Sequence, residues 1–368
     1  MAAGLPDRIA AVRQRWERLF PAPAATGSTG STVPRRVPGW RVIAGKELAD
    51  HVTSVRFLVL LVILALAAAV PLYFASGQLR TAAQQVSGGQ AIFLALFSLG
   101  SDQFSFLRAD RFIALLAPLL GIAFGFDAIN VERTDGTLPR LVSQPIHRDD
   151  VINGKFLAGL GVIALTLAAM VTLVTGFGML RLGIVPDISE IVRIVLWLAL
   201  TVLYVGLWLA FAMLLSVVLR RAASAALIGF GTWLAIVIFG SLVITLVANL
   251  VAPVPATVTT QADQEQDLAA RQTQQLITRL SPATLYVEAT SALLTPVDPV
   301  TAQGGAANYN ARSIDELIQA ADERRIPSLL SVDQSLLLIW PHVVALVAMT
   351  VLCFAAAYVA FMRQEVRA

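Results

Sequence analysis

The chain has 368 residues, of which 57% are hydrophobic and 14% are charged, and its mean hydropathy is +0.73. Soluble domains carry about 25% charged residues, and several apolar runs here exceed the roughly 18 residues that a helix needs to cross a bilayer. A β-barrel would show short alternating segments instead, so the composition excludes a soluble protein and predicts an all-α, polytopic membrane protein. The net charge of +3 indicates basic edges beside membrane spans, not nucleic-acid binding. Cys353 is the only cysteine, so neither an internal disulfide nor a cysteine-based metal site is expected.

The N-terminal region precedes any apolar run of membrane length. Residues 1–37 are predicted to be cytoplasmic, with an amphipathic helix at 7–20 and a linker rich in proline, glycine, serine and threonine at 21–37. A solvated helix and a helix that touches lipid headgroups fit 7–20 equally well. No signal peptide is expected, because this region lacks an apolar core. Residues 38–56 predict a second helix, whose charged residues include Lys46 and Glu47 and which lies in the membrane interface.

Apolar runs predict six spans, five of them within residues 57–252 and the sixth within residues 335–368. The predicted spans are residues 57–76, 111–130, 152–179, 191–218, 223–252 and 337–361. Residues 91–100 are apolar but too short to cross, so they are interpreted as interfacial or re-entrant. Gly121 and Gly125 form a G-x-x-x-G pattern that can mark close helix contact.

The placement of lysine and arginine predicts the orientation of the spans. With the N-terminus inside, basic residues lie in the N-terminal region, in the hairpin at 131–151, at Arg220 and Arg221, and at the C-terminal end, whereas the short loop 181–190 holds only Arg181. This distribution places both termini and the hairpin on the cytosolic side of a plasma membrane. The long polar stretch at 253–334 then faces outward as a helical insertion. Within it, residues 262–280 and 281–294 predict helices, and Ser313 with Glu316 fits a capping box. About 80 residues cannot bury a large core alone, so this insertion is expected to lean on the membrane part or on a partner.

Several catalytic and nucleotide-binding patterns are absent from the sequence. It has no G-x-x-x-x-G-K-[ST] loop, no H-E-x-x-H and no G-x-S-x-G, which favours a chain that is not itself an enzyme. His51, His147 and His342 lie on different elements, which argues against one shared metal. Asp127 is the ionisable residue nearest to a span interior, and it lies near a span end. A proton-coupled carrier is therefore disfavoured.

The connection between the second and third spans carries a specific pattern. It runs F-D-A-I-x-x-E-R-x-D-G-T-L from Phe126 to Leu138, then P-I-x-R from Pro145 to Arg148, then G-K at Lys155. This pattern resembles the signature of type-2 ATP-binding-cassette (ABC) permeases over about 30 residues, and the K-E-L at Lys46 resembles the start of the NosY-like branch. The interfacial helix then corresponds to the family's elbow helix. The long insertion at 253–334 departs from compact members of the family.

The resemblance implies a mechanism and a set of partners. Such permeases pair as homodimers or heterodimers, and the hairpin acts as a coupling helix that docks into separate cytoplasmic ATPase subunits. ATP and Mg²⁺ would bind those subunits, so no cofactor is expected on this chain. The coupling residues implied by the match are Glu132, Asp135, Gly136, Thr137, Leu138, Pro145, Arg148 and Lys155.

The residue types suit this role. Gly136 allows a turn, and Pro139 and Pro145 delimit a short helix. Glu132 could pair with a basic residue of the elbow helix or of the ATPase, and Arg148 and Lys155 suit docking or headgroup contacts. Asp149 or Asp150 could cap the third span. The alternative for each charge is an ordinary residue that marks the edge of the bilayer.

Two functions of different classes stay open at this point. The first is a permease subunit that exports a substrate; the second is a scaffold that recruits an ATPase and acts on an extracytoplasmic partner through 253–334. A membrane-embedded enzyme is disfavoured, because the spans hold no cluster of catalytic residue types. Tyr204, Trp208 and Trp233 suit a lipid-like or amphipathic substrate, and they equally suit helices packed against lipid.

Overall fold

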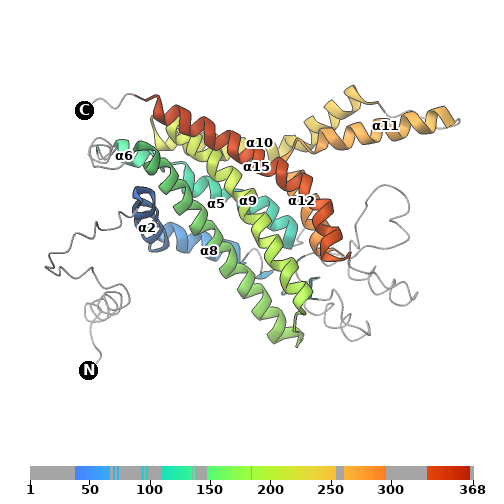
Figure 1. The fold of residues 1–368 in the computed structure, drawn as a ribbon, viewed down its shortest axis with the longest axis horizontal. Coiled ribbons are helices and arrows are strands. Elements are labelled where there is room, and N and C mark those ends of the chain that lie inside the picture. Colours follow the sequence, from blue (N-terminus) through green and yellow to red (C-terminus); the bar gives the residue numbers. More distant parts are fainter. Residues whose placement is uncertain are drawn as a thin grey trace, which may run out of the picture. The chain divides into compact units, whose positions relative to one another are not determined.

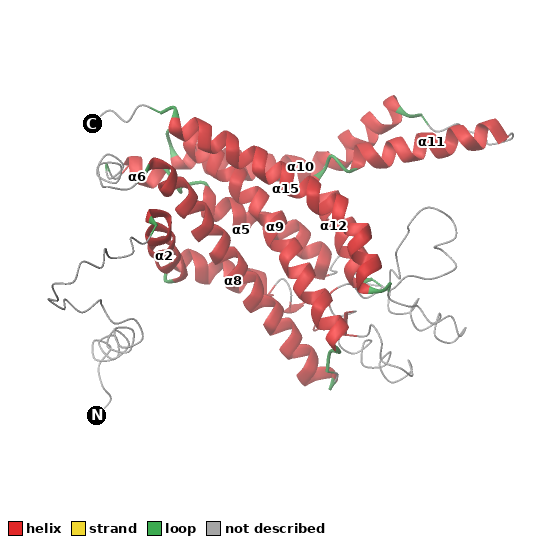
Figure 2. Cartoon of the chain, in the orientation of Figure 1, coloured by secondary structure: helices red, strands yellow, loops and turns green. Residues whose placement is uncertain are grey.

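A computed structural model describes most of the membrane part of the chain. The described residues are 38–66, 69–70, 73, 93–94, 97, 109–134, 136, 147–183, 185–253, 261–295 and 330–364. Within these ranges every regular element is a helix, which confirms the all-α prediction (Figures 1 and 2). The predicted segment 1–37, the hairpin centre 137–146 and the capping box at Ser313 lie outside the described residues.

Five described helices are long and apolar enough to cross a membrane. They are α5 with α6 (together Arg111–Thr134 as one candidate span), α8 (Arg148–Leu182), α9 (Ile188–Val218), α10 (Ala222–Val251) and α15 (Val332–Met362). A sixth results if α2 (Gly39–Val52) and the helix Val55–Leu66, which meet at a bend of 64°, count as one span. The chain is therefore a multi-pass membrane protein, and the count of six stays a prediction.

Capping explains why several helices begin earlier than hydropathy predicts. Asp187 and Glu190 form a capping box at the start of α9, and the Glu190 carboxylate accepts from the backbone N–H of Asp187 at 3.0 Å. Ser331 and Gln334 form the corresponding box for α15, so this helix starts at Val332 and not at 337. The residues of both capping boxes are polar and accept hydrogen bonds from free backbone N–H groups at the helix start. A hydropathy average does not detect this role.

The start of α8 differs from the prediction. Its N-cap is His147, which makes no side-chain cap hydrogen bond, while Asp149 and Asp150 lie inside the first turn. The proposal that one of these aspartates is the cap residue is therefore wrong. Carboxylates in the first turn still favour the helix, because the helix dipole is positive there.

Helix α9 is the central helix of the described bundle. It contacts α5, α8, α10, α12 (Pro282–Leu294) and α15, and it runs through the middle of the bundle in Figure 1. Its buried side chains include Trp197, Tyr204 and Met213. A helix that is apolar on all sides is expected to be buried among other helices. The apolar residues Phe93 and Phe97 are also fully buried, and Phe97 packs on Trp197 with ring centroids 5.2 Å apart.

Helices α5 (Ala109–Gly125) and α9 approach each other at backbone distance. A Cβ placed on Gly121 would lie 2.5 Å from the Val205 carbonyl oxygen, and one on Gly125 would lie 2.7 Å from the Ala212 Cβ. Only hydrogen fits at both positions, which confirms the G-x-x-x-G prediction. The two glycines fix how closely these helices pack.

A proline inside α5 explains one interhelical hydrogen bond. Pro118 has no N–H, so the Ala114 carbonyl one turn earlier lacks its usual helical donor. The Tyr204 hydroxyl of α9 donates to this carbonyl at 3.1 Å. Partners from neighbouring helices commonly satisfy backbone groups that a membrane proline frees.

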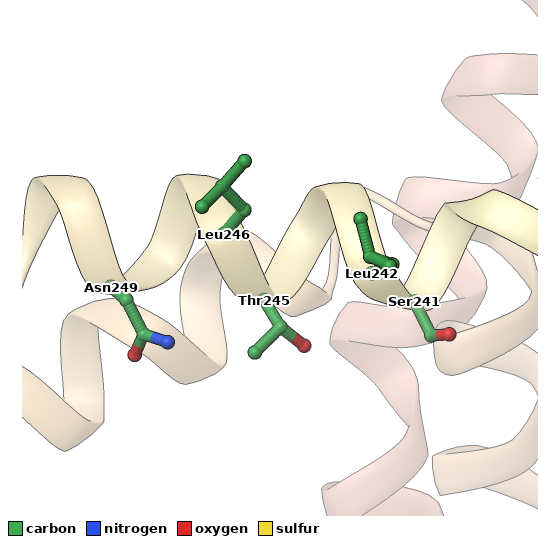
Figure 3. A pocket seen from close by; sticks show the side chains of 5 residues that line it. All are labelled: Ser241, Leu242, Thr245, Leu246 and Asn249. Carbon is green, nitrogen blue, oxygen red and sulfur yellow. The ribbon is translucent and has the colours of Figure 1, made fainter.

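Helix α10 is exposed along most of its length. On it only Ala225, Gly229 and Ala248 are buried, and the exposed positions are almost all apolar. Figure 3 shows Ser241 and Thr245 on one side of α10, with Leu242 and Leu246 on another. A continuous apolar exterior of this kind fits contact with lipid, as the membrane prediction requires.

The insertion between α10 and α15 contributes two described helices with different surroundings. Helix α11 (Gln261–Thr278) is polar and returns along the end of α10, where Gln274 donates to the Ala252 carbonyl at 2.8 Å (Figure 1). Helix α12 is buried against α9 and α15, and its Tyr286 stacks on Tyr204 with centroids 4.5 Å apart. This confirms that part of the insertion leans on the membrane bundle.

A buried arginine joins the same three helices. Arg193 of α9 is 2% exposed and donates to the Leu293 carbonyl at 3.0 Å, to the Ser335 hydroxyl at 3.2 Å and to the Leu330 carbonyl. Leu293 lies in the last turn of α12, and Leu330 and Ser335 flank the start of α15. The guanidinium therefore holds the two ends of residues 295–330 against α9, since each of these carbonyls would otherwise be buried without a donor.

The contacts of Glu288 in α12 predict a pH-dependent contribution to the free energy of unfolding. Its carboxylate bonds the Arg279 Nε and the His342 Nε2, each at 2.8 Å. Burial raises the pKa of Glu288, but the hydrogen bonds from His342 and Arg279 outweigh burial and hold that pKa below its ordinary value. A depressed pKa in the folded state contributes stability above the unfolded pKa, and this contribution is lost as pH falls through the folded pKa. We expect Glu288→Gln to cost about 1 kcal/mol near pH 7.

The measurement is the unfolding midpoint of purified protein as a function of pH. The difference in unfolding midpoint between wild type and Glu288→Gln should be largest at neutral pH. It should disappear as pH falls below about 4.3, the unperturbed pKa of glutamate. Glu265→Gln, on the exposed side of α11, is the matched control and should show no gap. A gap that widens in acid would contradict the prediction.

Candidate functional site

The candidate site is the elbow junction, which we define as the contacts of α2 and Arg56 with α5, α6 (Asn130–Thr134) and α8. Helix α2 lies directly against α8. A Cβ on Gly154 of α8 would lie 2.9 Å from the Ile43 side chain and 3.0 Å from the Trp40 carbonyl oxygen. The glycine lets the two helices touch at the point where α8 leaves the predicted hairpin.

Three charged residues meet at this contact. The Lys155 ammonium of α8 lies 3.0 Å from the Glu47 carboxylate of α2 and 3.2 Å from the Glu132 carboxylate of α6. The side chains are 6%, 14% and 12% exposed for Lys155, Glu47 and Glu132. A buried ammonium is tolerated only where carboxylates compensate it. The three residues therefore form a single ionic unit that joins α2 to both arms of the predicted hairpin.

A second ion pair holds the bend after α2. Arg56 bonds both carboxylate oxygens of Asp127, at 3.1 and 2.7 Å, and donates to the Ala123 carbonyl at 2.9 Å. Its guanidinium also lies 5.1 Å from the Phe126 ring centroid. The planar fork of arginine suits this bidentate geometry. Asp127 is therefore part of a fixed contact between the bend and the end of α5.

The end of α9 is capped from α6. Arg133 donates to the Val217 carbonyl at 2.9 Å and to the Leu219 carbonyl at 3.3 Å. The Ser216 hydroxyl accepts from the backbone N–H groups of Ile129, at 3.1 Å, and of Asn130, at 3.2 Å. Helix ends leave carbonyls without partners, and a cation there also complements the helix dipole.

The C-terminal end of α15 joins the same contacts. Gln364 donates to the Val217 carbonyl at 2.7 Å and accepts from Arg133, and Arg148 donates to the Gln364 carbonyl at 3.2 Å. The ends of α6, α8, α9 and α15 are thus linked by hydrogen bonds next to the predicted hairpin. A displacement of either hairpin arm would have to break or carry these bonds.

The described part of the hairpin agrees with the turn predicted from Gly136. This residue has φ +66°, and its N–H donates to the Arg133 carbonyl at 3.3 Å. A positive φ is a conformation that glycine adopts without strain. Asp135, Thr137, Leu138 and Pro145, four of the predicted coupling residues, lie outside the described residues.

The other predicted site residues are distributed over the junction. Glu132 pairs with Lys155 of α8, and Lys155 is buried between carboxylates. Lys46 is 66% exposed and lies 3.5 Å from Asp50 on the same helix. Their roles in coupling to an ATPase are untested and stay predictions.

Several residues of the junction were missed as contacts. The sequence marks Asp127 only as a charge near a span end, and no pattern in it points to Arg56, Ser216 or Gln364 as contacts. One signal was available for the missed cap: α9 ends at Val218 with Leu219 in an extended conformation and with no glycine or asparagine to close the helix. Such an end requires an outside donor.

Comparison with known proteins decides the family. Residues 41–366 match the family described as ABC-2 family transporter protein. The chain belongs to this family. A relative in it is the probable ABC transporter permease protein NosY of Stutzerimonas stutzeri, to which the chain is 32% identical over 162 residues. The aligned stretch covers 40% of this chain and 56% of that relative, so the chain spans little more than half the relative's length.

The ABC-2 family assignment covers every element of the junction. The matched residues include α2 from Arg41 onward, both arms of the hairpin and the end of α15. The resemblance stated from the F-D-A-I-x-x-E pattern, including its similarity to NosY, is thereby confirmed. The described residues contain no group of three or more histidine, cysteine, aspartate or glutamate side chains placed to hold a metal.

Proposed function

We propose that the chain is the permease subunit of an ABC transporter, which couples ATP hydrolysis by a separate ATPase subunit to export of a substrate. The observation that carries this proposal is the bond of one ammonium, that of Lys155, to carboxylates on both the elbow helix and α6. Family membership supplies the context, and the relative's printed name includes the word permease.

The junction supplies a path by which the hairpin could move the spans. An ATPase that pulls the hairpin would displace the end of α6 and the start of α8. Helix α2 would then move together with α6 and α8, because the ionic unit holds Glu47 and the close contact at Gly154 holds Ile43. The opposite end of the bundle lies about 36 Å away along the 24 residues of Arg111–Thr134, at about 1.5 Å per residue. Rigid helices transmit displacement over such distances.

The proposed arrangement also assigns partners and placement. ATP and Mg²⁺ bind the partner ATPase, and this chain sits in the plasma membrane with both termini in the cytosol. Basic residues at the hairpin support that orientation. A second permease copy and lipid share the exposed faces of α10 and α15, of which the Leu242 and Leu246 side of α10 is an example (Figure 3).

The experiment reconstitutes the chain with its ATPase subunit in vesicles and measures ATP hydrolysis together with export. Replacing residues 137–146 by a glycine-serine linker should abolish export and uncouple hydrolysis from it. Glu132→Gln should lower export, because the carboxylate that accepts from Lys155 is lost, while Glu265→Gln on α11 should leave both rates unchanged. Unaltered export and hydrolysis in the linker variant would show that the coupling assignment is wrong.

One observation favours the scaffold as a second candidate. Helix α11 is polar overall, yet its Leu268 and Leu276 side chains are 60% and 65% exposed. Exposed leucines on a polar helix fit an extracytoplasmic partner. Two results together would favour the scaffold over the permease. ATP hydrolysis would depend on the hairpin although no substrate is exported, and a Leu268→Ser, Leu276→Ser double variant would lose this activity.

A further inference from the structure

A cavity of about 490 Å³ lies between α5, α9, α10 and the start of α12, at the end of the bundle opposite the elbow junction. Its volume falls within the range of about 300–1,000 Å³ that is typical of ligand sites. Helix α10 forms one wall, and most of that helix is exposed to lipid. The cavity is therefore reachable sideways from the bilayer.

Part of the cavity lining is aromatic. Tyr204 and Trp208 of α9 and Trp233 of α10 line it. The Tyr204 hydroxyl and the Trp233 indole N–H each donate to an α5 carbonyl at 3.1 Å, so their polar atoms are already satisfied and the rings are left as apolar walls. Aromatic rings with satisfied polar atoms bind hydrocarbon well. This part of the cavity suits an acyl chain.

The lining also carries a positive charge. Arg111 is the only charged residue in the described wall, which contains no aspartate or glutamate. Ser241 and Thr284 line the cavity as well, and Thr284 belongs to the first turn of α12, where backbone N–H groups and the helix dipole favour an anion. A guanidinium without a carboxylate at a membrane-facing cavity is complementary to a phosphate or a carboxylate.

We propose that this cavity binds an anionic amphiphile, with its acyl chain against Trp208 and Trp233 and its anionic group at Arg111. Two sources share this chemistry: a membrane phospholipid and a free fatty acid. The inference depends on membrane placement and on the cavity alone. It can therefore fail or succeed independently of ATPase coupling.

The test measures ligand binding to delipidated, detergent-purified full-length protein by native mass spectrometry. The probes are lysophosphatidylglycerol, palmitate and zwitterionic lysophosphatidylcholine of equal chain length. We expect one saturable site for an anionic probe and about tenfold weaker binding in Arg111→Gln, a factor that corresponds to about 1.4 kcal/mol. Arg111→Lys should retain most of the affinity, and Ser241→Phe, which places a ring in the cavity, should abolish binding.

The controls separate the outcomes. Arg221→Gln removes an exposed arginine at the other end of α10 and should leave affinity unchanged, and each variant is compared with wild type by its unfolding midpoint. Preference for lysophosphatidylglycerol identifies a phospholipid site, and preference for palmitate identifies a fatty-acid site. Equal binding of the zwitterionic probe, with no effect of Arg111→Gln, would overturn the proposal. So would disulfide cross-linking between copies through Ser241→Cys in a Cys353→Ser background, since a partner helix would then fill the cavity.

Discussion

Lys155→Met is expected to destabilise the protein more than any other single charge removal at the elbow junction. The substitution keeps the length of the side chain but leaves the carboxylates of Glu47 and Glu132 together without the ammonium that lies 3.0 and 3.2 Å from them. Breaking a buried ion pair by removal of one partner costs about 3–5 kcal/mol, because a charge is left buried without compensation. The measurement is the unfolding midpoint of purified protein, together with the yield of monodisperse material.

The chain offers a matched control and a rescue for this prediction. Lys46→Met removes an ammonium one residue from Glu47 that is 66% exposed, so its cost should stay within about 1 kcal/mol. A triple variant in which Glu47→Gln and Glu132→Gln accompany Lys155→Met should recover most of the loss, because no uncompensated charge remains buried. If Lys46→Met and Lys155→Met are equally destabilising, the three residues do not act as an ionic unit.

The long helices were predictable because hydrocarbon imposes a simple rule on sequence. Apolar runs of about 20 residues located the long helices to within a few positions. The starts of α9 and α15 were misplaced, since Asp187, Glu190, Ser331 and Gln334 are polar residues that belong to the helix and lower a hydropathy average. The insertion was expected to lean on the membrane part or on a partner, but nothing in the sequence marks α12 as the helix that does so. Its 13 residues are too few to cross a bilayer, and their apolar content reflects packing against α9 and not lipid.

The site was predictable residue by residue but not contact by contact. The hairpin pattern marked Glu132 and Lys155, and the elbow sequence marked Glu47, yet nothing in the spacing shows that these residues meet. The pairing of Lys155 with Glu47 spans 108 positions and depends on how α2 folds onto α8 at Gly154. Periodicity describes one helix at a time, whereas tertiary contacts between helices decide which charges share a partner.

Gly121→Ala is expected to prevent the normal approach of α5 to α9. The added Cβ would lie 2.5 Å from the Val205 carbonyl oxygen and 2.8 Å from the Leu209 backbone nitrogen. Both are backbone atoms of the central helix, so no rotamer change can relieve the overlap. Overpacking typically costs about 1–3 kcal/mol and sometimes more, and the backbone contact places this variant at the upper end. The measurement is the change in unfolding midpoint and in expression of folded protein.

The same substitution elsewhere should have the opposite sign, which makes the comparison decisive. Gly176 lies in α8, and a Cβ placed on it would have no neighbouring atom within 4 Å, so Gly176→Ala meets no obstacle. Alanine is favoured over glycine inside a helix by about 1 kcal/mol, and Gly176→Ala should therefore raise the midpoint or leave it unchanged. At Gly121 the same propensity gain is outweighed by the backbone overlap. If both variants raise the midpoint, α5 and α9 do not pack through Gly121, and the hydrogen bond from Tyr204 to the Ala114 carbonyl would also be wrong.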